Sequence, residues 1–171
     1  MVPVCLRAVR YDDLLQLHQD SPQDDPFQFF GFRASNGLQR RYAQDGLISD
    51  DLGMLAVEDG EGTLVGDIGW FAVRHGPSST ARALNVGITL LPEHRGRGLG
   101  TAAQAAFAGH LFRTTLVERL EAGTDVENVA EQRALEKAGF TREGTARHAQ
   151  FRDGAWHDLV VYSRLRGDPA P

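Results

Sequence analysis

The sequence predicts one domain of the α/β or α+β class, built on a mixed β-sheet. Two pairs of apolar, β-prone runs are separated by Asp-Gly turns, at Asp59-Gly60 and at Asp153-Gly154, and this pattern is typical of β-hairpins. Between the two hairpins, an Ala-rich helical pattern follows a loop of glycine and arginine and precedes a further apolar run. Strands joined partly by turns and partly by a helical crossover form a sheet with both pairing directions. The length of 171 residues fits a single domain.

The first fifty residues combine one strand, two helices and an aromatic loop. Val4–Arg10 alternates weakly and predicts a strand, and the helix that follows has Asp12 as its expected N-cap. Residues 21–32 hold two prolines and four phenylalanines and predict a loop. Its aromatic side chains either fill the core or line a binding site. Residues 35–46 predict the second helix.

The middle of the chain predicts an antiparallel meander followed by a loop and a long helix. The three strands are expected at 51–58, 63–73 and 82–91, and the last one is closed by Pro92. After the loop, residues 101–116 predict a helix whose alanines and glycine keep one face small. A small face permits close packing against a sheet or a ligand.

The last third predicts a strand, a helix and the second hairpin. The strand is expected at 117–124, and the helix at 128–138 ends at Gly139, since glycine is the usual residue after a helix C-terminus. Residues 141–151 and 155–165 form the hairpin.

The loop between the third strand and the long helix predicts an anion site. A helix N-terminus leaves backbone N–H groups unpaired and carries partial positive charge. Gly96, Gly98 and Gly100 let the backbone approach a ligand closely, and Arg95 and Arg97 add full charges. A phosphate or pyrophosphate is the expected ligand. The spacing matches neither a Walker loop nor the GxGxxG dinucleotide fingerprint, although a generic nucleotide-phosphate binder remains an alternative.

Bulk properties narrow the classes of function. The net charge of −5 argues against nucleic acid as the main ligand. No stretch approaches 18 apolar residues, so we expect no membrane span. The first ten residues lack the apolar segment of a signal peptide, and Cys5 is the only cysteine, which fits a reducing compartment. We therefore expect a cytoplasmic protein.

Three blocks of the sequence resemble the GNAT superfamily of N-acyltransferases. Arg95-x-x-Gly98-x-Gly100 matches that family's [QR]-x-x-G-x-[GA] acetyl-CoA loop. The stretch from Asn128 to Phe140 resembles its second block, N-x-x-[SA]-x-x-x-[LY]-E-K-x-G-F, and FRDGAWHDLVVYSRL near the end is similar to the RimJ/RimL branch. The resemblance covers about residues 50–166. It implies acetyl-CoA or another short acyl-CoA as co-substrate, and no metal.

The resemblance also implies a fold and a cofactor site. The expected fold is a mixed, mostly antiparallel sheet flanked by helices, in which a splayed strand pair holds the cofactor. Residues 1–50 form the acceptor side, 51–140 the cofactor-binding core and 141–166 the C-terminal hairpin. The expected cofactor-binding residues are Ile88, Thr89, Leu90, Leu91, Arg95, Gly96, Arg97, Gly98, Leu99, Gly100, Thr101, Asn128 and Lys137.

The catalytic residues are harder to predict. In the family, a Tyr in the second block protonates the leaving thiolate, but here that position is Leu135. RimL-type members use a Ser three residues after the Asn, and here it is Glu131, which is either an acid–base group or part of a solvated helix face. Asp67 and Asn85, on adjacent strands, are further candidates. The backbone N–H of Leu90 is the expected oxyanion donor.

The expected reaction is direct acyl transfer to an amine in a ternary complex. The acceptor is a small-molecule amine or a protein N-terminus, and Phe29, Phe30, His157 and Asp158 are its candidate contacts. The branch also implies a possible homodimer, with the aromatic stretch of residues 27–32 as a candidate interface. Because the usual Tyr and Ser are missing, a CoA-binding sensor or pseudoenzyme without turnover is the alternative.

Overall fold

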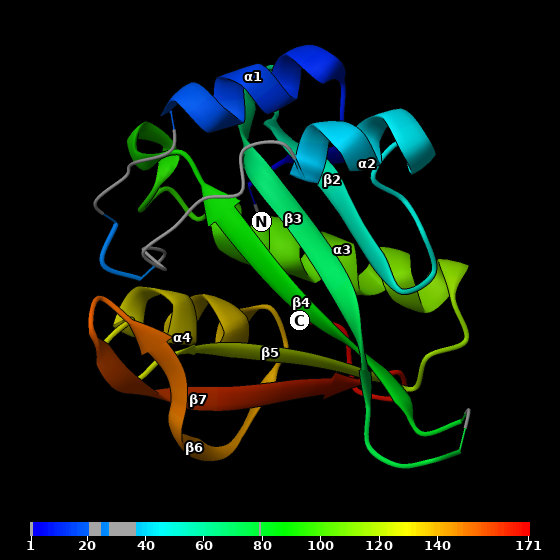
Figure 1. Cartoon of the computed structure of the whole chain (residues 1–171), viewed down its shortest axis with the longest axis vertical. Helices are drawn as coiled ribbons and strands as arrows, with labels where there is room; N and C mark the ends of the chain where they lie inside the picture. The colour runs from blue at the N-terminus through cyan, green and yellow to red at the C-terminus, as the bar shows by residue number, and fades with distance from the viewer. Residues whose placement is uncertain (1, 21–24, 28–36, 79) are drawn as a thin grey trace.

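Seven strands form one mixed sheet in the order β1-β2-β3-β4-β5-β7-β6 (Figure 1). The structure is a computed structural model and describes residues 2–20, 25–27, 37–78 and 80–171. The strands are Val4–Ala8 (β1), Leu52–Asp59 (β2), Leu64–Arg74 (β3), Arg82–Leu90 (β4), Arg119–Asp125 (β5), Thr141–Arg152 (β6) and Ala155–Leu165 (β7). Among these described strands only β4 and β5 pair in parallel, so the predicted mixed, mostly antiparallel sheet is confirmed.

Helices cover both faces of this sheet. The helices are Tyr11–Asp20 (α1), Gly37–Asp45 (α2), Leu99–Thr114 (α3) and Val129–Lys137 (α4), with a short 3₁₀ turn at Pro92–His94. Figure 1 shows α1 and α2 on the near side of the β2–β4 region, and α3 behind the sheet. The family-type fold expected from the sequence is therefore present.

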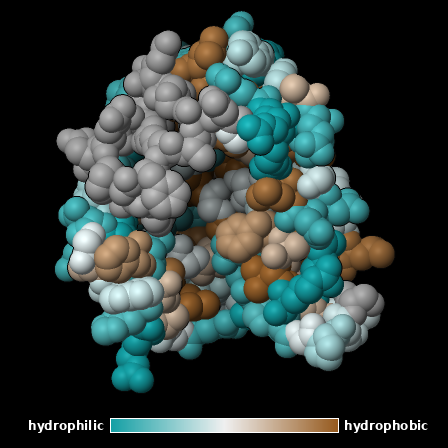
Figure 2. All heavy atoms as spheres, viewed as in Figure 1, coloured by the Kyte–Doolittle hydropathy of each residue, from teal (hydrophilic) through white to brown (hydrophobic). Residues whose placement is uncertain are grey.

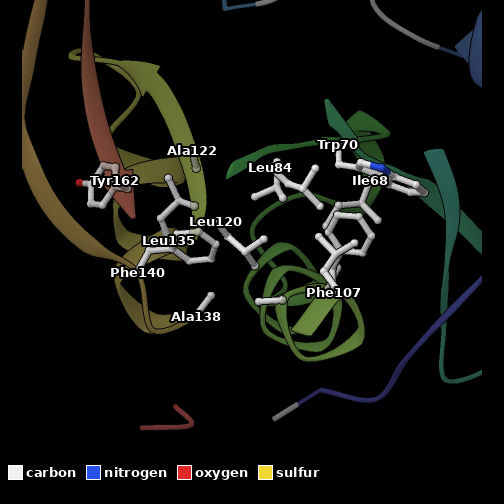
Figure 3. Packing of buried hydrophobic residues seen from close by; sticks show 14 of the residues in the cluster. Ile68, Trp70, Leu84, Phe107, Leu120, Ala122, Leu135, Ala138, Phe140 and Tyr162 are labelled. Atoms are coloured by element: carbon white, nitrogen blue, oxygen red, sulfur yellow. The ribbon is translucent and has the colours of Figure 1, made fainter. Parts of the chain in front are cut away.

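The main core lies between the sheet and the helices α3 and α4. Phe107 of α3 is fully buried and packs 5.9 Å from the Trp70 ring, measured between ring centroids. Leu120 of β5 lies between this group and a second group around Leu135 and Phe140 (Figure 3). The core thus joins α3 to α4 through the start of β5.

A smaller core lies on the opposite face of the sheet. Leu14 and Leu17 of α1 pack with Leu47, Ala56 and neighbouring residues of the sheet. Since side chains alternate along a strand, residues of β2 and β3 contribute in turn to the two cores.

Both predicted hairpins are confirmed, and their turns explain why. Asp59 Oδ1 accepts hydrogen bonds from the backbone N–H groups of Glu61 and Thr63, each at 3.0 Å. Asp153 and Gly154 have φ of 49° and 75°, which is the left-handed pair that a two-residue type I′ turn requires.

The parallel pair β4/β5 separates soon after it forms. Only two residue pairs connect these strands, Leu84 with Leu120 and Asn85 with Glu121. β4 then continues to Leu90 beside β3 alone, and Figure 1 shows β4 and β5 diverging. The expected splay is therefore present, and it leaves one edge of β4 without a neighbouring strand.

Several predicted boundaries were wrong by one or two residues. β1 ends at Ala8 rather than Arg10, and α3 begins at Leu99 rather than at residue 101. Asp12 does not cap α1. Instead, Asp13 Oδ2 accepts from the backbone N–H of Arg10 at 2.6 Å, and the same carboxylate pairs with Arg7. The start of α1 is therefore fixed by its third residue, which satisfies the N–H just before the helix.

Candidate active site

The loop before α3 ends in a bare helix N-terminus. Gly98 is the N-cap residue, with φ of 79°, and no side chain caps the helix. The first bond of the helix runs from Ala102 N–H to Gly98 C=O at 3.1 Å. The N–H groups of residues 99–101 precede that bond, so they have no partner within the helix. Such N–H groups, close to the left-handed Gly96 and Gly98, form a site for an anion.

A cleft of about 690 Å³ opens between the diverging strands and reaches this loop. Its walls come from the β4 edge, the start of α3, the end of β5, one side of α4 along its whole length and part of β6. In the space-filling view, the surface is hollowed near its centre, where brown apolar atoms are visible (Figure 2). The cleft is therefore continuous from the anion site to the open edge of β4.

The two arginines of the loop have different surroundings. Arg95 lines the cleft, where its Nε donates to Leu90 C=O at 2.9 Å and its Nη2 pairs with Asp25 at 2.8 Å. Arg97 lies instead at a second, smaller hollow with Asp59, and its Nη1 is 3.4 Å from His94 Nδ1. Only Arg95 is therefore placed in the cleft.

Alternate residues near the end of β4 point their N–H groups to the cleft side, and Leu90 is one of them. Leu91 N–H donates to Val65 C=O at 2.9 Å, so it is already used within the sheet. The Leu90 carbonyl points the other way, where it accepts from Arg95. Because the N–H and C=O of one strand residue point to the same edge, the Leu90 N–H faces the cleft side as well.

The remaining residues of the expected cofactor set divide between the cleft and the core. Ile88, Leu90, Gly96, Gly98, Gly100, Thr101, Asn128 and Lys137 line the cleft with Arg95. Leu91 and Leu99 are buried in the two cores, and Thr89 pairs with Asp67 on the opposite face. Asn128 is the N-cap of α4, where its Oδ1 accepts from Glu131 N–H at 3.2 Å.

Glu131 projects from the first turn of α4 into the cleft and is not on a solvated helix face. Its Oε1 accepts a hydrogen bond from Gln104 Nε2 of α3 at 2.9 Å. Burial raises the pKa of Glu131 to about 7, an effect that the bond from Gln104 offsets only in part. Burial therefore favours the neutral form of this carboxyl group.

Asp67 and Asn85 are not brought together with Glu131. Asp67 is paired with Ala56 and Thr89, and Ala56 belongs to the smaller core on the α1/α2 face. Burial raises the pKa of Asp67 to about 7. Asn85 sits where β4 and β5 still pair, and neither residue lines the cleft.

The acceptor-side candidates fall into two groups. His157 Nδ1 lies 3.2 Å from Asp125 Oδ2, which also pairs with Arg152 at 2.5 Å. Asp158 Oδ1 accepts from His148 N–H at 2.8 Å and so orders the bulged part of β6. Phe29 and Phe30 lie outside the described residues.

Four cleft-side residues were not predicted from the sequence. Asp25 pairs with Arg95, the buried Asp125–Arg152 pair lines the cleft, and Gln104 contacts Glu131. Burial acts to raise the pKa of Asp125, but the Glu127 N–H and the Arg152 guanidinium outweigh it and hold the pKa below its usual value. Of these four, only Gln104 could have been suspected from the sequence, because it is a polar residue among the alanines of the predicted helix.

Comparison with known families identifies the class of protein that this fold and cleft define. A family model described as an acetyltransferase (GNAT) domain matches residues 4–141. The chain belongs to the GNAT acetyltransferase family, and the resemblance that the three sequence blocks carried is confirmed.

Two curated relatives match a little over half of the chain at about 30% identity. The chain is 34% identical over 105 residues to "Probable N-acetyltransferase YjcK" of Bacillus subtilis, covering 61% of this chain and 56% of that protein. It is 29% identical over 103 residues to "Uncharacterized N-acetyltransferase YoaA" of the same organism, covering 60% and 56%. The chain spans about half the length of these curated relatives.

Solved structures show the same fold. A spermidine N-acetyltransferase from Vibrio cholerae, in complex with CoA and spermine, aligns with a TM-score of 0.80 at 20% identity, over 96% of both chains. RimJ of Mycobacterium smegmatis, in complex with CoA-disulfide, aligns with a TM-score of 0.76 at 25% identity, over 95% of this chain and 81% of that one. A ribosomal-protein-S5-alanine acetyltransferase from Vibrio fischeri has a TM-score of 0.76 at 20% identity, over 98% and 96%.

Two features are absent from the described part of the chain. None of its helices has the length and apolar character needed to cross a membrane. No three His, Cys, Asp or Glu side chains gather there in a way that would hold a metal ion.

Proposed function

We propose that the protein transfers an acetyl or other short acyl group from acyl-CoA to a primary amine by direct attack in a ternary complex. One observation carries this proposal: the cleft opened by the β4/β5 splay begins at the bare N-terminus of α3. A ligand with an anionic end and a long flexible arm fits such a site, because its charge meets unpaired N–H groups and its arm follows a free strand edge.

The cofactor would be held mainly by backbone groups. The N–H groups of residues 99–101 would bind the pyrophosphate, with Arg95 beside them. Hydrogen bonds to charged groups contribute about 1.5–3 kcal/mol each, so two or three are enough to anchor it. The pantetheine arm would then extend along Ile88 and Leu90 and pass Asn128, with Lys137 at the same cleft.

The chemistry would take place at the far end of the arm, along the free edge of β4. Leu90, the expected oxyanion donor, lies beside the anion site, because a Cβ at Gly100 would meet Leu90 Cδ1 at 3.5 Å and Arg95 donates to Leu90 C=O. Its N–H would therefore hold the arm near the pyrophosphate, and a cleft-side N–H farther back along β4 would stabilise the oxyanion that forms when the amine attacks. Asp67, with a pKa of about 7 but on the other face of the sheet, would need the amine to approach from the α1/α2 side to act as a base. Asn85 does not line the cleft, so we propose no role for it in the reaction.

Two kinds of amine are candidate acceptors. One solved relative carries spermine and another is a ribosomal-protein-alanine acetyltransferase. We place small-molecule amines first and protein N-termini second. Asp25 and Asp125 line the cleft but are paired with Arg95 and Arg152, so the charge of the lining does not choose between these acceptors. His157 and Asp158 lie next to that end of β6 and β7.

Release of CoA with a panel of amines and N-terminal peptides tests the activity, and calorimetry with acetyl-CoA tests binding separately. Turnover that saturates with one class of amine supports the proposal. Tight acetyl-CoA binding without turnover on any amine would replace it with a CoA sensor, an alternative that the buried Leu135 at the usual Tyr position favours. Displacement of acetyl-CoA by ATP or NAD would instead point to a generic nucleotide binder.

A further inference from the structure

The pair Gln104–Glu131 joins the two helices that flank the cleft. Gln104 lies on α3 and is only 3% exposed. Its Nε2 donates to Glu131 Oε1 on α4 at 2.9 Å. Glu131 also lines the cleft, so a buried amide fixes the direction of a carboxyl group that reaches a ligand site.

The other atom of the same amide is available to a protonated Glu131. Gln104 Oε1 is buried and has no hydrogen-bond partner among the described residues. An unpaired buried acceptor costs about 1–3 kcal/mol. A neutral Glu131 carries an O–H group, and donation of that group to Oε1 would pair the orphan atom while Nε2 keeps its own bond. The amide therefore has a partner for both of its polar atoms when Glu131 is protonated, whereas the ionised carboxylate pairs with Nε2 alone.

The surroundings of Glu131 agree with this geometry. Burial is the main cause that raises its pKa to about 7, and the Gln104 bond is the opposing one. The charged residues that line the same cleft are Asp25, Arg95, Asp125, Arg133, Lys137 and Arg152. Two of them, Asp25 and Asp125, are in ion pairs with Arg95 and Arg152, so their charges are partly compensated.

We propose that Glu131 is the acid that protonates the leaving thiolate of CoA, and that Gln104 is the positioning residue that holds it. This inference rests on the proposed function. The amine nitrogen attacks the thioester carbon, the oxyanion collapses, and the C–S bond breaks. The sulfur takes the proton of Glu131 and leaves as CoA thiol. The acylated nitrogen loses its extra proton to solvent, and solvent reprotonates the Glu131 carboxylate, so the step is balanced.

Kinetics of two variants test the roles. Glu131→Gln keeps the shape but cannot donate a proton, so kcat should fall about 10²-fold with little change in KM for acyl-CoA. The loss of kcat with rising pH near 7 should disappear. Gln104→Met removes the amide at similar volume, and kcat should fall about tenfold because the carboxyl group is no longer held in place.

Gln104→Met should also move the basic limb of kcat to higher pH. The amide bond to the charged carboxylate is stronger than the bond to the neutral acid, so its loss destabilises the carboxylate more and raises the pKa of Glu131. Glu127→Gln, an exposed neighbour, and Gln132→Met, which loses bonds only to the Asp125 and Val126 carbonyls, are the matched controls. Neither control variant should change the pH at which kcat falls. The proposal would be overturned if Glu131→Gln kept the wild-type kcat and the wild-type fall of kcat with rising pH.

A second measurement does not depend on turnover. Carbon-13 NMR titration of the glutamate carboxyl groups, assigned with Glu131→Gln, should show a pKa of about 7 for Glu131 that rises in Gln104→Met. A value near the ordinary one of about 4.3 would refute the pair as a proton holder. If the titration succeeds and no amine is acylated, the proposed function fails while the proton-holding pair stands.

Discussion

At the scale of single residues, Gly98 and Gly100 place different demands on the loop. Gly98 has φ of 79°, a conformation that costs an L-residue about 1–2 kcal/mol, so a side chain there strains the backbone. Gly100 lies within α3, and a Cβ there would meet Leu90 Cδ1 at an ordinary contact distance of 3.5 Å. Gly100 therefore allows a test of ligand approach without strain in the fold.

Gly100→Val should weaken acetyl-CoA binding about tenfold or more, because the side chain keeps the anion from the N–H groups of α3 and one charged hydrogen bond is worth at least that factor. Calorimetry measures the dissociation constant, and thermal unfolding should change little. Gly144→Val is the control, since a Cβ at Gly144 meets nothing within 4 Å and the residue lies away from the cleft. An unchanged dissociation constant in Gly100→Val would contradict the loop assignment.

The sequence predicted the loop residues better than the polar ones. Gly96, Gly98 and Arg95 are recognisable because a bare helix N-terminus needs those residue types. The environments of Glu131 and Gln104 depend on how α3 packs against α4, which no local pattern reveals. For the same reason, Arg97 was expected at the cleft with Arg95, although it faces another hollow.

At the scale of elements, α3 is the helix that ties the core together. Phe107, Ala103 and Leu111 are almost fully buried along one side of it. Phe107→Ala should lower the free energy of unfolding by about 3–5 kcal/mol, because it leaves a cavity under Trp70. Urea denaturation measures the loss. Phe151→Ala, at a position that is 55% exposed, should change it far less, and equal losses would show that α3 is not anchored through Phe107.

The second hairpin was predictable because Asp153-Gly154 adopts a left-handed pair of conformations that few other residue pairs adopt. In the first hairpin, the Asp59 carboxylate instead orders a longer turn by accepting from the Glu61 and Thr63 N–H groups. The start of α3 was placed two residues late, since glycine is a poor helix former and Gly100 hides the first turn. The aromatic loop at residues 21–32 gave no unique prediction, and of its phenylalanines the structure describes only Phe27, whose ring lies 5.7 Å from the Arg152 guanidinium carbon.

At the scale of the whole molecule, two carboxyl groups make stability depend on pH. Asp67 and Glu131 have folded-state pKa values of about 7, above their ordinary values of about 3.9 and 4.3. Between these limits the folded protein binds more protons than the unfolded chain, so the free energy of unfolding should fall as pH rises from about 4 to 7.

Urea denaturation between pH 5 and about 8 measures this slope, and Asp67→Asn with Glu131→Gln should flatten it. The exposed pair Asp50→Asn with Glu127→Gln should leave the slope unchanged. A wild-type slope in the first double variant would show that neither carboxyl group has a raised pKa in the folded state.

Glu143 has the opposite effect on stability. Arg119 and Ser163 lower its pKa to about 2, so its contribution to stability is lost only in acid.

The fold class followed from the sequence because two hairpins and a crossover helix, in this order along the chain, leave few arrangements of one sheet. No single apolar stretch of the sequence predicts how far β4 and β5 pair, because the length of that pairing depends on where β5 meets β7. The family resemblance, rather than strand periodicity, supplied that expectation.

The brief β4/β5 pairing has a consequence for motion. Strands β1–β4 and strands β5–β7 share only two residue pairs along the sheet, and the core around Leu120 joins them behind it. A molecule seated along this seam would brace both halves at once. Amide hydrogen exchange should therefore slow in strands β1–β4 and in strands β5–β7 together when acetyl-CoA is added, because one ligand would contact both groups of strands.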